Sequence, residues 1–292
     1  MNTAVDATID MRIVPMDGPF GAQIRGVDLS QPMPRKAFLG IARALRDHHV
    51  LVFEHQNLDK AQYLAFGRQW GQPILFFNPS HREQAFPELI TIHNRPDTAP
   101  RQKNAAMQWH VDSSYEIPPA AVTMLHGIEA PSKGNETLFL DMAAAYDALP
   151  ESMKARIEGL VVRHGLGDPR FFLEGEYRGR DENLSPERLN LRVHHPLVMP
   201  HPQTGRKVIY APGGSPMGIV GMPDEEAIAL LRALKVHSIR PEFMLRAAAQ
   251  AGSVVIWDNY AVMHSATPTV YSDADGERRL LYRISTREMI AL

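Results

Sequence analysis

The sequence predicts an α+β fold with a mainly β core, of the sandwich or jelly-roll type, flanked by helices. Short apolar runs punctuated by Pro and Gly recur from about residue 71 onward, helical periodicity is confined to a few segments, and neither an internal repeat nor a flexible linker interrupts the chain. Many brief strands separated by long connections are typical of such β cores. We therefore expect one continuous domain over residues 1–292.

The N-terminal part is predicted to alternate short strands with helices. Met11–Val14 and Ala22–Val27 are predicted as short strands, and the second alternates apolar and polar side chains. Apolar residues at helical spacing predict a helix from Arg35 to His48, and the apolar run Val50–Phe53 predicts a buried strand after it. A second helix is expected from about Asp59 to Trp70.

Beyond Gly71 the predicted strands are short. They are Ile74–Phe77, Leu89–Ile92, Ala121–Leu125, Thr137–Leu140, Val208–Tyr210, Val254–Trp257 and Leu280–Ile284. Helical periodicity returns in Met142–Leu149, Ser152–Leu160 and Asp224–His237, and we expect these helices outside the sheets. Residues 165–192 lack a clear pattern, so this segment is interpreted either as a lid over an active site or as a surface insertion without a role.

The composition excludes several classes of protein. Hydrophobic residues make up 44% and charged residues 22%, which is typical of a globular chain and not of a coiled coil or a disordered one. A net charge of −2 gives no attraction to nucleic acid or anionic lipid, and no apolar run is long enough to span a bilayer. No secretion signal is recognisable, so the expected location is the cytoplasm. With no cysteine, any metal must be bound by His, Asp or Glu.

One histidine lies beside a carboxylate at a spacing that suits chelation. His110 and Asp112 are two residues apart, and on a strand such positions project from the same face. His264, which follows a predicted strand and a turn, is the best candidate for a third ligand. Two histidines and one carboxylate form the facial set that leaves open positions on Fe(II). A buried, hydrogen-bonded His-Asp pair without metal is the plainer alternative.

Two arginines near the C-terminus are predicted to share one strand face. Arg279 and Arg283 are four residues apart, whereas Leu280 and Tyr282 lie on the opposite face. Arginine suits bidentate recognition of carboxylates, so the pair indicates a site for two anions or for one diacid. A solvated edge strand is the alternative for either arginine alone.

These motifs together resemble the taurine dioxygenase and 2,4-dichlorophenoxyacetate dioxygenase family of iron(II)- and 2-oxoglutarate-dependent oxygenases. The order is that of the family: His-x-Asp, a Thr about two dozen residues later, a distant His and then Arg. Further similar segments are Gly21–Leu29, His49–Phe53, Leu64–Gly71, Gly134–Thr137, His195–Val198 and Trp257–Asn259, so the resemblance covers nearly the whole chain. It implies a double-stranded β-helix fold.

The resemblance also implies roles for individual residues. His110, Asp112 and His264 would bind Fe(II), and Thr137 with Arg279 would bind the distal carboxylate of 2-oxoglutarate. Arg278 would fit the family spacing to His264 more closely, but its side chain would leave the strand on the other face. With O₂, such an enzyme converts 2-oxoglutarate to succinate and CO₂ and hydroxylates a substrate C–H bond, which can cleave the product.

The predicted substrate is a small anionic molecule. By resemblance, Arg283 would pair with its acidic group, while Phe76 or Phe77 with Tyr115 would contact an aromatic or apolar body such as that of an aryloxyalkanoate. Core packing is the alternative for the phenylalanines. The other functions considered are a sulfonate or alkyl sulfate dioxygenase of the same family, a non-catalytic jelly roll that binds an anion, and a metal-dependent hydrolase. Resemblance alone suggests a homo-oligomer.

Overall fold

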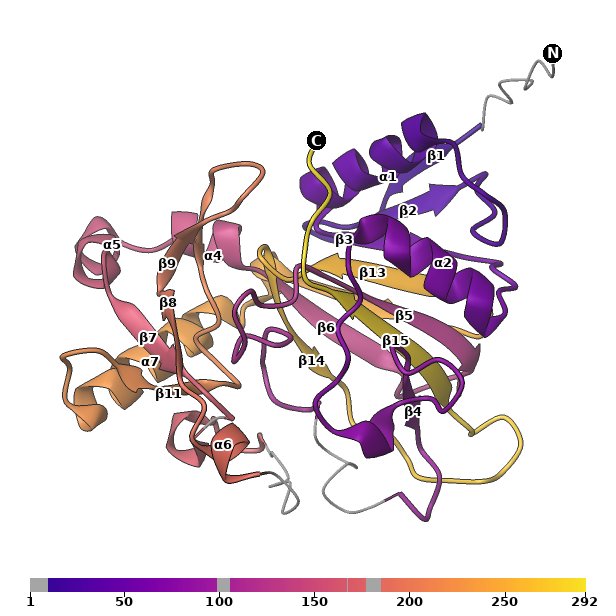
Figure 1. Ribbon diagram of the computed structural model, residues 1–292. Coiled ribbons are helices and arrows are strands. Elements are labelled where there is room, and N and C mark those ends of the chain that lie inside the picture. The colour runs from indigo at the N-terminus through magenta and orange to yellow at the C-terminus, as the bar shows by residue number, and fades with distance from the viewer. Residues whose placement is uncertain (1–9, 99–105, 167, 177–184) are drawn as a thin grey trace.

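A seven-stranded, mostly antiparallel sheet forms the centre of the computed structural model, which describes residues 10–98, 106–166, 168–176 and 185–292 (Figure 1). Its strands run in the order β1 (Arg12–Pro15), β2 (Ala22–Arg25), β3 (Val50–Phe53), β13 (Val254–Asp258), β5 (Val122–Glu129), β15 (Leu280–Thr286) and β4 (Ile90–His93). Only β2 and β3 pair in parallel. The fold is thus mixed α and β with one large sheet, as the sequence predicts.

Two helices cover one face of this sheet. Helix α1 (Arg35–His48) and helix α2 (Lys60–Trp70) coincide with the two predicted N-terminal helices. Asp59 begins α2 through a capping box with Gln62, which satisfies backbone donors at the helix start. The buried faces of both helices join a cluster that also contains the outward side chains of β5 and β13. Burial of apolar side chains between the helices and the sheet is the main contribution that stabilises this packing.

A three-stranded sheet faces the other side. It consists of β12 (Met244–Ala248), β6 (Glu136–Asp141) and β14 (Val262–Ala266), in that order. Phe139 of β6 and Leu245 of β12 lie in one buried cluster with Leu125, Trp257 and Leu281 of the large sheet. The two sheets therefore share a core.

A third group of elements packs beside the sheets around a core of its own. It contains the sheet β11 (Pro216–Ile219), β7 (Val161–His164), β8 (Val193–Pro196), the ribbon β10 (Lys207–Ile209), β9 (Val198–Pro200), and the helices α4 (Met142–Asp147), α5 (Glu151–Ile157), α6 (Pro186–Leu189) and α7 (Asp224–Ser238). The short 3₁₀ turns are η1 (Pro79–His81), η2 (Pro169–Phe171) and η3 (Pro241–Phe243).

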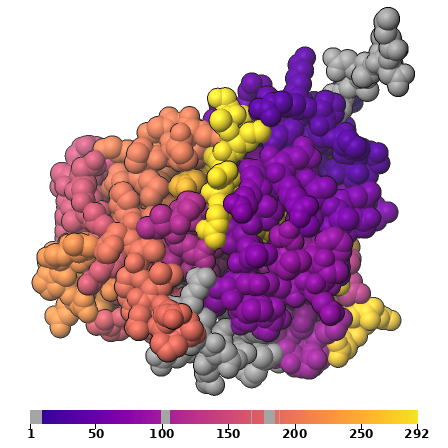
Figure 2. Space-filling model, in the orientation of Figure 1, coloured from indigo at the N-terminus to yellow at the C-terminus, as the bar shows by residue number. Residues whose placement is uncertain are grey.

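The C-terminal segment connects the two halves of the molecule. Figure 2 shows it in yellow, lying across the surface between the N-terminal part and the part that carries residues near 200. Arg287 N donates to Gln72 O at 3.0 Å, and Gln203 Nε2 donates to Ile290 O at 2.7 Å. The tail is thereby tied to both halves. Among the described residues, no helix is long and apolar enough to cross a membrane.

Several sequence-based expectations differ from the structure. Ile74–Phe77 forms no strand. Pro73 pairs with Thr286 in an isolated bridge and Ile74 N donates to Ser285 O at 2.8 Å, but the carbonyl of Phe76 accepts from the Arg82 side chain at 2.6 Å instead of from a neighbouring strand. β12 and β14 were not expected as strands. Within residues 165–192, η2 and α6 are formed, whereas residue 167 and residues 177–184 lie outside the described part, so the predicted lid stays untested.

Candidate metal centre and active site

Three side chains that are distant in the sequence meet at one point. Nε2 of His110 lies 3.9 Å from Oδ1 of Asp112, and Nε2 of His264 lies 3.6 Å from Oδ2 of the same carboxylate. One potential ligand atom from each residue lies within 4.8 Å of the other two. The structure thus brings together the two histidines and the carboxylate that the sequence singles out.

The backbone conformation that positions these ligands differs from the predicted strand. His110 and His264 form an isolated antiparallel bridge, in which each amide donates to the other's carbonyl at 2.9 Å. Residues 112–115 then turn, and Ser113 has φ +49°, so the expected strand through His110 and Asp112 is wrong. The turn, rather than strand alternation, brings the carboxylate back to the imidazoles.

The donor set fits a divalent cation such as Fe(II). Asp112 is 3% exposed, and within the described part of the chain its buried Oδ2 accepts no hydrogen bond. Nδ1 of His110 lies 2.7 Å from Gln108 O; a carbonyl can only accept, so Nδ1 carries the proton and Nε2 keeps a lone pair. A buried carboxylate oxygen without a proton donor, beside imidazole nitrogens, is the arrangement that a metal ion completes.

The electrostatics keep the ligands in metal-binding protonation states. Burial alone would raise the pKa of the Asp112 carboxyl, but the positive charge of Arg283 and the nearby histidines outweigh burial and hold this pKa well below its usual range. Burial, assisted by His110, lowers the pKa of His264 to about 3. The carboxylate is therefore ionised and the His264 imidazole neutral at physiological pH, as cation binding requires.

The two candidate arginines for the cosubstrate differ sharply in environment. Arg279 is half-buried, its Nε donates to Oδ1 of Asn135 at 2.5 Å, and desolvation lowers its pKa to about 10. Arg278 is 47% exposed and pairs with Glu129 and Asp275 instead. Within the β6–β14 pair, Thr137 lies opposite Ala266 and Phe139 opposite His264, so Thr137 and His264 share one face. The geometry favours Arg279 over Arg278.

The residues predicted to bind substrate lie together beside the triad. Arg283 is opposite Leu125 in the β15–β5 ladder, so its side chain enters the space between the two sheets, and its Nη1 lies 3.4 Å from Oδ1 of Asp112. The Arg283 guanidinium carbon lies 5.8 Å from the centre of the Phe76 ring. The Phe77 ring is 4.4 Å from that of Phe76 and 5.9 Å from that of Tyr115.

Comparison with known proteins is consistent with this geometry. Residues 12–285 match the model of the Taurine catabolism dioxygenase TauD, TfdA family. The chain belongs to this family. It is 33% identical over 264 residues to an alpha-ketoglutarate-dependent 2,4-dichlorophenoxyacetate dioxygenase of Cupriavidus pinatubonensis, with 86% of this chain and 90% of that protein covered.

Two further similar proteins are informative. An alpha-ketoglutarate-dependent sulfate ester dioxygenase of Pseudomonas putida is 26% identical over 95% of this chain and 89% of its own length. The crystal structure of a putative alpha-ketoglutarate-dependent taurine dioxygenase from Burkholderia xenovorans superposes with a TM-score of 0.77 at 31% identity, covering 94% of this chain and 89% of that one. The protein is thus a dioxygenase that uses Fe(II), 2-oxoglutarate and O₂ on a small molecule.

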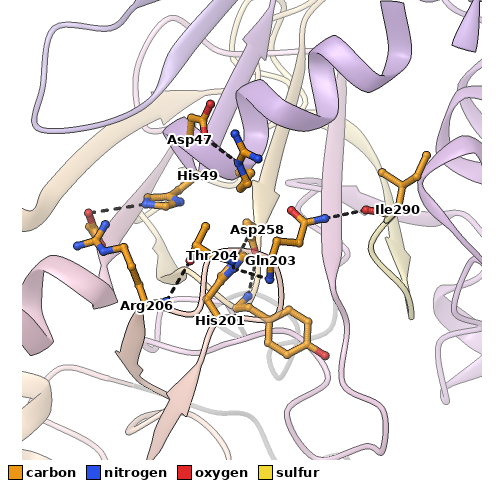
Figure 3. Close-up of polar contacts among 11 residues, drawn as sticks. Asp47, His49, His201, Gln203, Thr204, Arg206, Asp258 and Ile290 are labelled. Carbon is orange, nitrogen blue, oxygen red and sulfur yellow. Dashed lines mark hydrogen bonds and ion pairs between the residues drawn. The ribbon is translucent and has the colours of Figure 1, made fainter. Parts of the chain in front are cut away.

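Sequence reasoning missed the amide that contacts the Asp112 backbone and a buried ion pair next to it in the chain. Asn259 Oδ1 accepts from Asp112 N at 3.3 Å, and its amide nitrogen donates to Thr123 Oγ1 at 2.9 Å. Just before it, Asp258 accepts from Nε2 of His201 at 2.8 Å, with both side chains buried (Figure 3). The segments that carry Asn135 and Asn259 resembled the family, but nothing in a linear pattern showed which buried partners these amides would reach.

Proposed function

We propose that this dioxygenase hydroxylates a small anionic substrate with an aromatic or apolar body, such as an aryloxyalkanoate. The observation that carries the proposal is the position of Arg283, which lies against both the metal-ligand carboxylate of Asp112 and the ring of Phe76. A substrate whose acidic group pairs with this arginine would place its carbon atoms between the aromatic rings and the metal.

His110, Asp112 and His264 are the proposed iron ligands. Their donor set, burial and protonation states support the assignment. Bound Fe(II) supplies the oxidative chemistry that converts 2-oxoglutarate and O₂ to succinate and CO₂ and hydroxylates the substrate. The protein's own contribution is to hold the reactants in place and to exclude water.

Thr137 and Arg279 are proposed to bind the distal carboxylate of 2-oxoglutarate. Among the described residues, the half-buried Arg279 guanidinium meets an amide oxygen and a phenol but no carboxylate. An anionic ligand would complete its pairing, because an unpaired charge away from water is costly. Asn135 fixes the orientation of the guanidinium by accepting from Nε, which leaves the terminal nitrogens to face the ligand.

The proposed substrate site joins Arg283 with Phe76, Phe77 and Tyr115. Within the described residues, the buried Nε of Arg283 has no hydrogen-bond partner, so a donor is left for a substrate anion. Each Å² of apolar substrate surface buried against the rings would contribute about 25 cal/mol. An apolar body is therefore favoured over a small polar one.

A sulfate ester or sulfonate is the second candidate substrate class. The similarity to the sulfate ester dioxygenase favours it, and a guanidinium pairs with sulfate as well as with carboxylate. Family membership and the metal-ligand cluster favour an oxygenase over a non-catalytic anion-binding protein or a hydrolase.

We further propose that the two facing sheets form a jelly roll and that residues 1–292 are a single domain. The shared core between the large sheet and β12–β6–β14 supports the first proposal. The uninterrupted family match over residues 12–285 supports the second.

Succinate release tests the substrate proposal. The enzyme is supplied with Fe(II), 2-oxoglutarate and O₂, and aryloxyalkanoates, alkyl sulfates, sulfonates and matched uncharged ethers are compared. We expect aryloxyalkanoates to give the highest kcat/KM and the uncharged ethers none above background. Higher kcat/KM for alkyl sulfates would favour the second class, and preference for uncharged or cationic compounds would contradict the role of Arg283.

A further inference from the structure

A lysine lies wholly inside the protein, away from the proposed substrate and cosubstrate groups. The side chain of Lys235, near the end of α7, is 0% exposed. Burial lowers its pKa, and the contact with Glu176 opposes this shift. Burying an ammonium group this deeply costs free energy unless the group is paired, so the partners of Lys235 are informative about its role.

Glu176 is the partner, and it makes more than one contact. Its Oε2 accepts from Nζ of Lys235 at 2.5 Å and from the amide of Leu173. Nζ donates in addition to Phe171 O at 3.0 Å. The ion pair thus ties helix α7 to the turn at residues 171–176.

The second carboxylate oxygen of Glu176 contacts the backbone next to a proposed metal ligand. Oε1 accepts from the amide of Trp109 at 2.8 Å, and Trp109 is the residue before His110. A carboxylate that is held by a buried ammonium therefore fixes the peptide unit that leads into a proposed metal ligand. Such a charge-assisted hydrogen bond is stronger than a neutral one.

Packing around Trp109 leaves little freedom for adjustment. A Cβ at Gly213 would lie 2.5 Å from Trp109 O and 2.9 Å from Cδ of Lys235. A Cβ at Gly214 would lie 2.5 Å from Cβ of His110, and Gly214 has φ +82°. The lysine stem, the glycine pair and the His110 backbone are in close contact, so a displacement on one side is transmitted to the other.

We propose that Glu176 and Lys235 are positioning residues for the iron site, acting through the amide of Trp109 to fix the place of His110. The inference rests on the proposed function, because it takes His110 as a metal ligand. Partners of this kind, one step behind a ligand, typically change metal affinity by about 10- to 100-fold when removed. Lys235 supplies the charge that holds the Glu176 carboxylate in place.

Two double variants separate the hydrogen bond to Trp109 from the buried charge. Lys235→Met with Glu176→Gln removes both charges but keeps an oxygen that can accept from Trp109 N. Lys235→Met with Glu176→Leu removes the charges and the acceptor together. The exposed pair Lys207 and Glu158, 2.9 Å apart, provides the control with the same substitutions.

The first measurement is the affinity of the purified protein for Mn(II), together with the visible spectrum of its Co(II) form. We expect the control to resemble the wild type, and the Met/Gln variant, which loses the charge but keeps the acceptor, to bind less than about 10-fold more weakly. The Met/Leu variant should bind about 10- to 100-fold more weakly with an altered Co(II) spectrum. A folded Met/Leu variant with unchanged affinity and spectrum would overturn the proposal.

The second measurement is hydrogen exchange at the Trp109 amide in the metal-free protein. We expect exchange to be faster in the Met/Leu variant than in the Met/Gln variant, and equal rates would overturn the proposal. Should Met/Leu not fold, Glu176→Asp keeps the charge but cannot reach Lys235 and Trp109 together, and the same two outcomes apply to it. A wild type that binds no metal would refute the iron site itself, while the exchange rates would still show whether Glu176 fixes the Trp109 amide.

Discussion

Nη1 of Arg283 lies 3.4 Å from Oδ1 of Asp112, so the arginine proposed to bind the substrate's acidic group also contacts a proposed iron ligand. A substrate anion would compete with Asp112 for this guanidinium. Substrate binding and the electron-donating strength of the carboxylate ligand are thereby linked through one side chain.

Replacement of Arg283 tests the substrate role. We expect Arg283→Ala to lower kcat/KM for an anionic substrate by about 100-fold, because the substrate loses its charge-assisted partner. Release of succinate without substrate should persist. Arg283→Lys should recover only part of the loss, since an ammonium cannot pair in a bidentate way. Equal kcat/KM in wild type and Arg283→Ala would contradict the assignment.

The neighbouring arginines give a matched pair of variants for the cosubstrate. Arg279→Ala should raise the KM for 2-oxoglutarate by about 100-fold, whereas the exposed Arg278→Ala should change it less than about twofold. Steady-state succinate formation at varied 2-oxoglutarate measures both. A larger effect at Arg278 than at Arg279 would reverse the assignment.

Asn259 is expected to stabilise the turn that carries Asp112. Asn259→Ala would leave the Asp112 amide, Trp257 Nε1 and Thr123 Oγ1 without their present partner, at a cost of roughly 2 kcal/mol or more in the free energy of unfolding. Urea unfolding measures this change, with the exposed Asn190→Ala as control. A loss no greater than that of the control would show that the amide is dispensable.

Because His164 is buried, we expect the free energy of unfolding to decrease in mild acid. Burial lowers its pKa from 6.5 to about 3, and both ring nitrogens lack hydrogen-bond partners among the described residues. Between these two values the unfolded chain binds a proton that the folded chain does not, so the free energy of unfolding decreases as pH falls, by up to about 1.4 kcal/mol per unit. At pH 7 and above the effect is absent.

Urea unfolding of the metal-free protein between pH 7 and pH 5 measures this dependence. His164→Leu should show a shallower decrease than the wild type, because it removes the group that takes up the proton. The exposed His55→Asn should keep the wild-type slope. An identical slope in His164→Leu would assign the acid sensitivity to other groups.

Local sequence patterns were enough to predict the helices and strands with strong periodicity or a continuous apolar run. Helices α1 and α2 follow directly from their apolar spacing, and β3 and β13 from continuous apolar runs between turn residues. Strand β14, which carries His264, is five residues long, and its sequence Val-Met-His-Ser-Ala has neither a continuous apolar run nor a regular apolar and polar alternation, so it contains no strand signal.

From the sequence, only those residues of the candidate site could be predicted whose spacing matches a known family pattern. His110, Asp112 and His264 could be selected because their chemistry and order match a family pattern, and the structure brings them together. The partnership of Glu176 and Lys235 could not be selected, because these residues are 59 positions apart and each alone has the features of a surface charge. Buried polar contacts of this kind depend on tertiary packing.

The central claim is that His110, Asp112 and His264 bind one ferrous ion beside 2-oxoglutarate. Anaerobic titration of the protein with Fe(II) and 2-oxoglutarate, followed by visible absorption, tests it most directly. We expect a weak charge-transfer band that saturates with metal in the wild type and is lost in His110→Ala, Asp112→Ala and His264→Ala. A band that survives these substitutions, or its absence from well-folded wild-type protein, would contradict the claim.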